Sequence, residues 1–304
     1  MATISVGGAI GGGFSLIRRE PVAVVIWAAI LVGFSVLRLL VYLPLYGALA
    51  NQFGRTGSTP DIQAMLPQMQ QAQAFGLLLS IVGIGLNTML ACAVFRAILR
   101  PEDRGFVYLK FGSTELLLFV FTIGAFIALF IGLLVLLIPV GIIAGIAAAA
   151  SGPANVAATG VFVLIGLLMS FGVMLYFALR LSLLGPLMVD ENQFRIGEAW
   201  ALTKGKVGSL FLIGLVLFLM LVVAELVTFG VGAGLLFASI GGIANLRGSF
   251  QQSGPEILAH FAPVIGVVGL LFVLLIAIFL PVAIAPWALA YRDLKKVDLA
   301  AAFS

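Results

Sequence analysis

Hydrophobic residues form six long runs along the chain, at approximately residues 22–46, 75–98, 116–138, 161–185, 210–236 and 264–290. A helix needs about 20 apolar residues to cross a hydrocarbon core of about 30 Å. Each run is that long, and none carries more than one charge except near its ends. Transmembrane β-strands would alternate apolar and polar residues over about 10 positions. The pattern therefore predicts an all-α fold, a polytopic membrane helical bundle with six transmembrane helices.

Basic residues lie mostly on one side of this six-helix arrangement. Loops rich in Lys and Arg stay on the cytoplasmic side of a membrane. Of the 16 basic residues, 13 fall on one side: Arg18, Arg19, Arg96, Arg100, Arg104, Lys110, Arg180, Arg195, Lys204, Lys206, Arg292, Lys295 and Lys296. Only Arg55 and Arg247 fall on the other, and Arg38 lies inside the first run. We therefore expect both termini to be cytoplasmic.

A Ser-x-Pro motif recurs in the loops expected on the outer side. It is found at Ser58-Thr59-Pro60, Ser151-Gly152-Pro153 and Ser253-Gly254-Pro255, before the second, fourth and sixth runs. Proline at the first position of a helix gives up only an N–H that has no partner there. The motif therefore predicts the start of each even-numbered helix.

A second motif recurs on the cytoplasmic side. Lys110-Phe111-Gly112-Ser113 opens the third run and Lys206-Val207-Gly208-Ser209 opens the fifth. Both motifs repeat at intervals of roughly 95 residues. Fixed spacing of this kind is the signature of internal repeats. We therefore predict one membrane domain, 1–304, built from three two-helix repeats at approximately 1–98, 99–190 and 191–304.

Amphipathic segments precede the first and fifth runs. Ile196, Ala199, Trp200, Thr203 and Val207 follow the spacing i, i+3, i+4, i+7 and i+11 of a helix with one apolar face. Val6, Ile10, Phe14 and Ile17 follow a similar spacing, although neighbouring glycines weaken a helix there. We expect each repeat to begin with a short cytoplasmic amphipathic helix in the headgroup layer. The alternative is a simple connector with buried apolar residues.

Composition and charge agree with a membrane protein. Hydrophobic residues make up 62% of the chain and charged residues 9%, whereas soluble domains carry about 25% charged residues. A net charge of +4 is too small to indicate nucleic-acid binding unless it forms a concentrated basic face. A single cysteine excludes an internal disulfide framework.

The sequence offers no set of residues suited to catalysis. His260 is the only histidine, so a catalytic triad could be built only around it, and an interfacial histidine is the simpler interpretation. Cys92 lies among small apolar residues of the second run, as a thiol in a core does. We therefore expect no enzymatic activity, no cofactor and no metal site.

Two charges, Arg38 and Glu225, lie deep inside the apolar runs. A charge at the bilayer centre costs at least about 2.5 kcal/mol and often marks a functional site. The spacing from Pro21 to Arg38 is the same as the spacing from Gly208 to Glu225. This equal depth suggests that the two could form a substrate or proton site between repeats. The alternatives are a structural ion pair, or an Arg38 side chain that extends alone to the interface.

The segment after the fourth run carries a recognisable pattern. It comprises Arg180-Leu181-Ser182-Leu183-Leu184-Gly185-Pro186-Leu187-Met188-Val189-Asp190-Glu191, followed by Ala199-Trp200-Ala201-Leu202-Thr203-Lys204-Gly205. It resembles a bacterial six-span family that includes the membrane domain of glycerophosphoryl diester phosphodiesterases and the YciC-like inner-membrane proteins. In fused members the hydrolase is a separate soluble domain, which we do not expect here. The resemblance implies a stand-alone inner-membrane module, with Arg180, Pro186, Glu191, Trp200 and Lys204 as its cytoplasmic motif.

These observations favour a non-enzymatic protein of the bacterial inner membrane. We expect a role in membrane organisation, lipid handling or partner assembly, with membrane lipids and a membrane protein as partners. The alternative is a transporter or channel for ions or small molecules, with a site near Arg38 and Glu225. A continuous polar cavity that reaches Glu225 would favour transport. The sequence does not indicate an oligomeric state.

Overall fold

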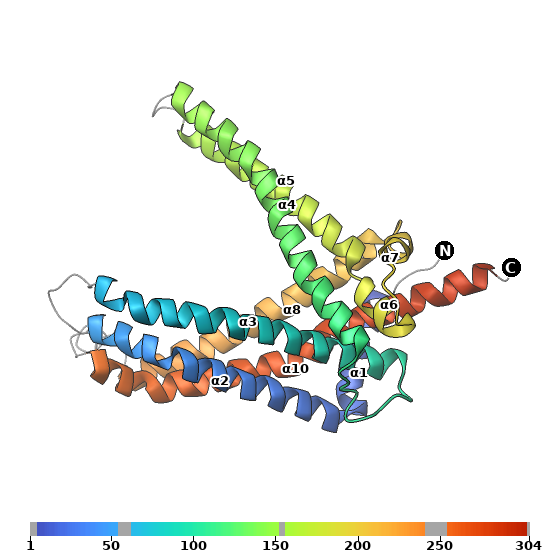
Figure 1. Ribbon diagram of the computed structural model, residues 1–304, viewed down its shortest axis with the longest axis horizontal. Coiled ribbons are helices and arrows are strands. Elements are labelled where there is room, and N and C mark those ends of the chain that lie inside the picture. The colour runs from blue at the N-terminus through green and yellow to red at the C-terminus, as the bar shows by residue number, and fades with distance from the viewer. Residues whose placement is uncertain (1–4, 54–61, 152–155, 241–253, 303–304) are drawn as a thin grey trace. The chain divides into compact units, whose positions relative to one another are not determined.

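A computed structural model describes residues 5–53, 62–151, 156–240 and 254–302, and every regular element in these ranges is an α-helix (Figure 1). The helices are α1 (Val6–Arg19), α2 (Pro21–Phe53), α3 (Ile62–Leu99), α4 (Ser113–Ser151), α5 (Val156–Leu181), α6 (Leu184–Glu191), α7 (Ile196–Leu202), α8 (Val207–Ile240) and α10 (Gly254–Ala302). The predicted all-α fold is confirmed.

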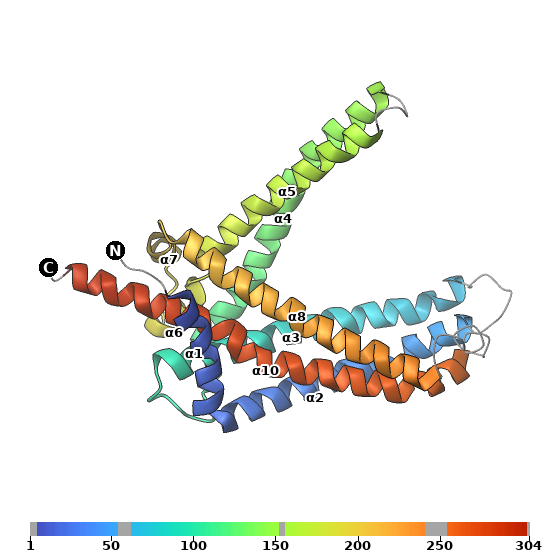
Figure 2. The same cartoon turned by 180° about the vertical axis from the view of Figure 1, so that it is seen from behind.

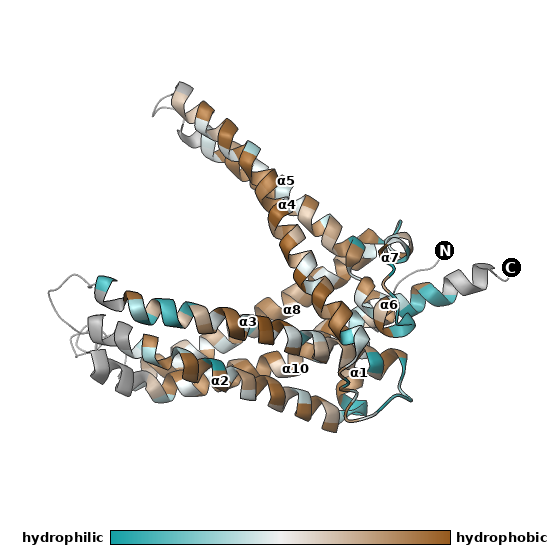
Figure 3. Ribbon diagram, in the orientation of Figure 1, coloured by the Kyte–Doolittle hydropathy of each residue, from teal (hydrophilic) through white to brown (hydrophobic). Residues whose placement is uncertain are grey.

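Six segments of the described chain are long and apolar enough to cross a membrane. They are Pro21–Gly47, Leu66–Leu99, Ser113–Ala149, Thr159–Glu191, Val207–Ser239 and Ala262–Lys296. Each contains one of the six predicted runs, and the long helices are coloured as hydrophobic over most of their length (Figure 3). The chain is a polytopic membrane protein.

The short helices differ between the three predicted repeats. Helices α1 and α7 precede the first and fifth runs, as expected. Before the third run, residues 100–112 form turns and an isolated bridge between Phe106 and Leu109. Val107 and Tyr108 have positive φ angles of 47° and 62°, which no helix tolerates. The expectation of an amphipathic helix in every repeat is therefore wrong for the second repeat.

The glycine-rich sequence of α1 has a structural reason at Gly13. A Cβ atom placed on Gly13 would lie 2.7 Å from the Cα atom of Val282 in α10. Only glycine allows two helix backbones to approach this closely. The glycines that weaken α1 as an isolated helix thus include one that packs it against α10.

The loop motif behind the predicted repeats lies mostly outside the described residues. Ser58-Thr59-Pro60, Gly152-Pro153 and Ser253 fall there, whereas Ser151 is the last residue of α4 and Gly254 the first of α10. Pro255 is thus the second residue of α10, close to its predicted place. The three repeats themselves stay a prediction.

The chain divides into two compact units. The first comprises 1–9, 91–213 and 286–304, and the second comprises 10–90 and 214–285. In the first unit, α4 and α5 lie side by side in both views, and α6 contributes the fully buried Leu184 and Leu187 (Figures 1 and 2). The second unit contains α2 and most of α3 and α8, with Trp27 fully buried.

Candidate functional site

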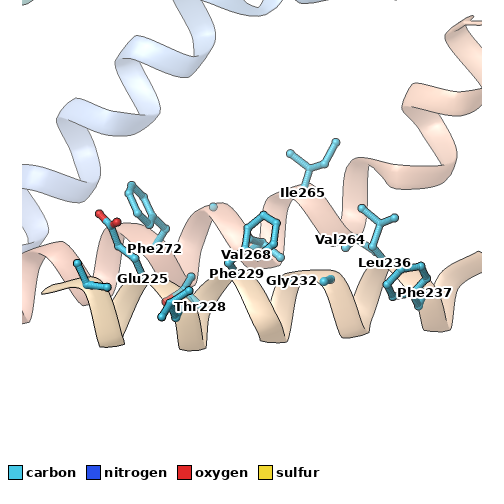
Figure 4. Close-up of a pocket in the computed structure, with 14 residues that line it drawn as sticks. Glu225, Thr228, Phe229, Gly232, Leu236, Phe237, Val264, Ile265, Val268 and Phe272 are labelled. Atoms are coloured by element: carbon cyan, nitrogen blue, oxygen red, sulfur yellow. The ribbon is translucent and has the colours of Figure 1, made fainter. Parts of the chain in front are cut away.

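An apolar groove within the second unit contains Glu225. Its volume is about 950 Å³, and 14 residues of α8 and α10 line it (Figure 4). Glu225 lies beside Phe272 at one end, and Phe237 and Val264 lie at the other. On α8 the lining residues extend from Val222 to Phe237, a length of about 22 Å at 1.5 Å per residue. The groove is therefore long, with a carboxylate near one end.

Polar groups are scarce in this groove. Of its lining residues, only Glu225 and Thr228 have polar side chains. The Thr228 hydroxyl donates a hydrogen bond to the Ala224 carbonyl, 2.9 Å away, so it is already satisfied. Gly232 lets α8 and α10 approach closely, since a Cβ atom there would lie 3.1 Å from Val268 Cγ1. Glu225 thus supplies the one polar group of the lining that is free to bind a partner.

Arg38 lies on an exposed part of α2, also in the second unit. Residues 36–40 are all exposed, including Leu37 at 48% and Leu40 at 58%. Five consecutive residues cover more than one full turn of 3.6 residues. Exposed residues therefore occur all round this turn of α2, whereas Phe34 and Tyr42, on the turns before and after it, lie against Gly83 and Gly76 of α3.

The structure does not pair Arg38 with Glu225. Both side chains are exposed, and neither forms an ion pair or hydrogen bond with any residue that the structure describes. They follow the helix starts at Pro21 and Val207 by nearly the same spacing. This spacing corresponds to about 26 Å along α2 and about 27 Å along α8. The two charges thus lie at similar distances from the starts of their helices but are not paired within one chain.

Arg180 belongs to a buried cluster at the end of α5 in the first unit. Its guanidinium carbon lies 4.2 Å from the centre of the Trp200 ring, a cation–π contact. Its Nη1 atom also donates a hydrogen bond to the Thr203 hydroxyl, 3.1 Å away. Thr203 in turn donates to the backbone carbonyls at the end of α7. Two residues of the predicted motif, Arg180 and Trp200, therefore fix α7 against α5.

The other motif residues do not join this cluster. Pro186 is buried in α6, and Lys204 is exposed, with no polar contact between its side chain and any described residue. Glu191 accepts a hydrogen bond from Lys295 Nζ at 2.8 Å and lies 3.5 Å from Arg195. The motif is thus divided between a buried contact, an ion-pair cluster and an exposed cation.

Sequence reasoning missed the partners of Glu191. Lys295 Nζ of α10 also contacts Asp190 Oδ2 at 2.6 Å, and the Tyr291 hydroxyl donates to the same oxygen at 2.9 Å. Arg100 donates to the backbone carbonyl of Asp190. Only the four-residue spacing of Tyr291 and Lys295 hinted that they share a helix face. These contacts hold the end of α10 on α6.

Sequence reasoning also missed a buried ion pair in the first unit. The guanidinium of Arg96 contacts the Glu115 carboxylate and donates to the Tyr108 carbonyl, 3.1 Å away. Glu115 also accepts a hydrogen bond from the Gly112 N–H at 2.9 Å. The exposed pair of Lys110 and Asp103 lies in the same turn, and its hydrogen bond holds the pKa of Asp103 below the ordinary value. The turn 100–112 is therefore fixed by charged residues.

The described residues contain no cluster of three or more His, Cys, Asp or Glu side chains suited to a metal ion. Cys92 is fully buried. His260 lies on α10, and its side chain is outside the described part of the structure.

Comparison of the chain with family models, with curated proteins and with solved structures gave no match.

Proposed function

We propose that the protein is a non-enzymatic assembly module of the bacterial inner membrane, in which the groove between α8 and α10 binds a transmembrane helix that carries a basic residue. Both termini are cytoplasmic in this proposal, as the distribution of basic residues indicates. The observation that carries it is Glu225, a carboxylate that lines an apolar groove and has no partner among the described residues.

The first argument is energetic. A charged side chain within the bilayer costs at least about 2.5 kcal/mol, and such groups usually pair with one another or face a polar cavity. Glu225 lies within the apolar segment Val207–Ser239, and its groove is not polar. A cation at the same depth on a partner helix would compensate the carboxylate.

The shape of the groove supports the same partner. Helices associate in membranes where small residues let their backbones approach closely. Gly232, Ala233 and Gly269 line the groove, among larger apolar side chains such as Phe229. A helix packed there would bury its apolar side chains along about 22 Å of α8.

Transport is less well supported. A pathway for ions or polar molecules would need polar groups along its length. The cavity reaches Glu225 but is otherwise lined by apolar side chains and by Thr228, whose hydroxyl bonds to its own helix. The lining therefore favours an apolar partner over a hydrophilic substrate.

Binding of a synthetic transmembrane peptide tests this function. The peptide would be a Leu/Ala helix with one Arg at the depth of Glu225, and a second peptide with Leu at that position is its control. Energy transfer would be measured in phospholipid vesicles, with the protein labelled at Phe111→Cys in a Cys92→Ala background. We expect the Arg peptide to bind more tightly than the Leu peptide.

Substitutions in the groove provide matched controls. Glu225→Gln should remove the preference for the Arg peptide, and Ala233→Trp should fill the groove and reduce binding of both peptides. Ala238→Trp should leave binding unchanged, because Ala238 is exposed on the same helix but does not line the groove. Equal binding of the two peptides to the unmodified protein would overturn the proposal.

A further inference from the structure

We infer that the helix received by the groove is α2 of a second copy of this chain, with Arg38 of one copy paired to Glu225 of the other. The inference rests on the proposed function and names its partner. It makes the protein a dimer, or a larger assembly of identical chains, within the membrane.

The depths of the two charges support this partner. Helices α2 and α8 both begin at the side that carries most basic residues, and Arg38 and Glu225 follow these helix starts by nearly the same spacing. A two-fold axis along the membrane normal keeps every residue at its own depth. Arg38 of each copy can therefore meet Glu225 of the other without a vertical shift.

The apolar surfaces match in the same register. Beyond Arg38, Tyr46 lies about two turns further along α2, about 80° from Arg38 around the helix, and is 47% exposed. Beyond Glu225, the groove continues along Phe229, Gly232 and Leu236 (Figure 4). On both surfaces the charge comes first and an apolar surface follows in the same direction. Tyr46 and Ala233, which also lines the groove, follow the first residues of their helices by nearly the same spacing.

Both surfaces are accessible within a single chain. Residues 36–40 of α2 are all exposed, and Phe229 is 75% exposed within its own groove. Two opposite charges that each face hydrocarbon lower the free-energy cost of their burial in the bilayer when they pair with one another. One sequence thus supplies the donor helix and the acceptor groove.

Charge reversal in two differently tagged copies tests the inference. Arg38→Glu creates like charges between copies of that variant, and Glu225→Arg does the same with two cations. When the two variants are mixed, Glu at position 38 meets Arg at position 225, and Glu225 meets Arg38. Co-capture is the amount of one tagged copy that is isolated with the other. We expect it to be at least tenfold lower for each variant alone than for the wild type, and to return to nearly the wild-type level when the two variants are mixed.

This design distinguishes the other arrangements. If Arg38 and Glu225 pair within one chain, a variant that carries both Arg38→Glu and Glu225→Arg recovers stability, but mixing the two single variants does not increase co-capture. That result overturns the inference. The inference is also overturned if either single variant self-associates as strongly as the wild type. It is overturned as well if wild-type copies are monomeric, as they would be if only lipid filled the groove. The Arg peptide still binds to such a monomer if the proposed function holds.

Neutral substitutions allow the same test if a variant with a reversed charge does not fold. Arg38→Gln and Glu225→Gln remove the ion pair without introducing repulsion. We expect each to reduce co-capture less than the reversals do, at unchanged helical content by circular dichroism. Unchanged co-capture with both Gln variants would contradict the inference.

Discussion

The guanidinium of Arg96 contacts the carboxylate of Glu115, and both side chains are almost completely buried, at 8% and 5% exposed. Arg96 is near the end of α3 and Glu115 near the start of α4, so the ion pair closes the turn between two predicted spans. Removal of one partner from a buried ion pair leaves the other charge uncompensated. The pair therefore holds together the first unit where α3 and α4 meet.

Glu115→Gln should destabilise the protein by about 3 kcal/mol, because Arg96 would lose its buried counter-charge. The free energy of unfolding in a mild detergent measures this. Asp103→Asn is the matched control, since Asp103 pairs with Lys110 at the surface and exposed pairs contribute about 0–1 kcal/mol. Equal losses for both variants would contradict a special role for the buried pair.

Lys295→Ala should free the C-terminal end of α10. Lys295 contacts both Asp190 and Glu191 of α6, so its loss leaves the Asp190 carboxylate without a cation and Glu191 with only its longer contact to Arg195. We expect faster amide hydrogen exchange over residues 291–296. Lys296→Ala is the control, because the Lys296 side chain is exposed and has no polar contact to the described residues. Unchanged exchange in Lys295→Ala would show that apolar packing alone holds this end.

Arg180→Lys should destabilise the contact between α5 and α7 by about 1–2 kcal/mol, although the charge is kept. Lysine cannot reproduce the flat stacking of a guanidinium on an indole ring together with its directed hydrogen bond. Denaturant unfolding would measure the loss. Lys204→Gln, at an exposed position of the same motif, should change stability by less than about 0.5 kcal/mol. The opposite ranking would mean that the motif serves a purpose other than packing.

The orientation predicted from the basic residues can be tested by labelling introduced cysteines. Cys92 is fully buried, so the unmodified protein gives little background. Phe111→Cys should react with a membrane-impermeant maleimide only in inverted vesicles, because Phe111 is 89% exposed in a loop predicted to be cytoplasmic. Ser58→Cys should react only in intact cells. The reverse result would invert the topology.

The fold could be predicted from the sequence because membrane spans obey a simple rule of length and hydrophobicity. The ends of the helices were less predictable. The second run was expected from residue 75, whereas α3 begins at Ile62, since the glutamines in between are good helix formers. The turn at 100–112 was missed because residues such as Val and Tyr rarely adopt the positive φ angles found at Val107 and Tyr108.

Only part of the candidate site could be predicted from the sequence. Arg38 and Glu225 stood out because charges are rare in apolar runs, and their equal depth could be counted directly. The groove beside Glu225 requires α8 and α10 to lie together, and no spacing along the chain indicates that contact. The partners of Glu191 were hidden for the same reason, because Lys295 is 104 residues away.

Cross-linking between copies tests the central claim most directly. Copies with Tyr46→Cys and differently tagged copies with Ala233→Cys, both lacking Cys92, would be mixed in vesicles and oxidised. We expect a disulfide-linked pair that carries both tags, since Tyr46 and Ala233 follow the first residues of their helices by nearly the same spacing and Ala233 lines the groove. Val231→Cys should give little of this product, because Val231 is exposed outside the groove. Equal cross-linking at positions 231 and 233, or none at either, would contradict docking of α2 in the groove.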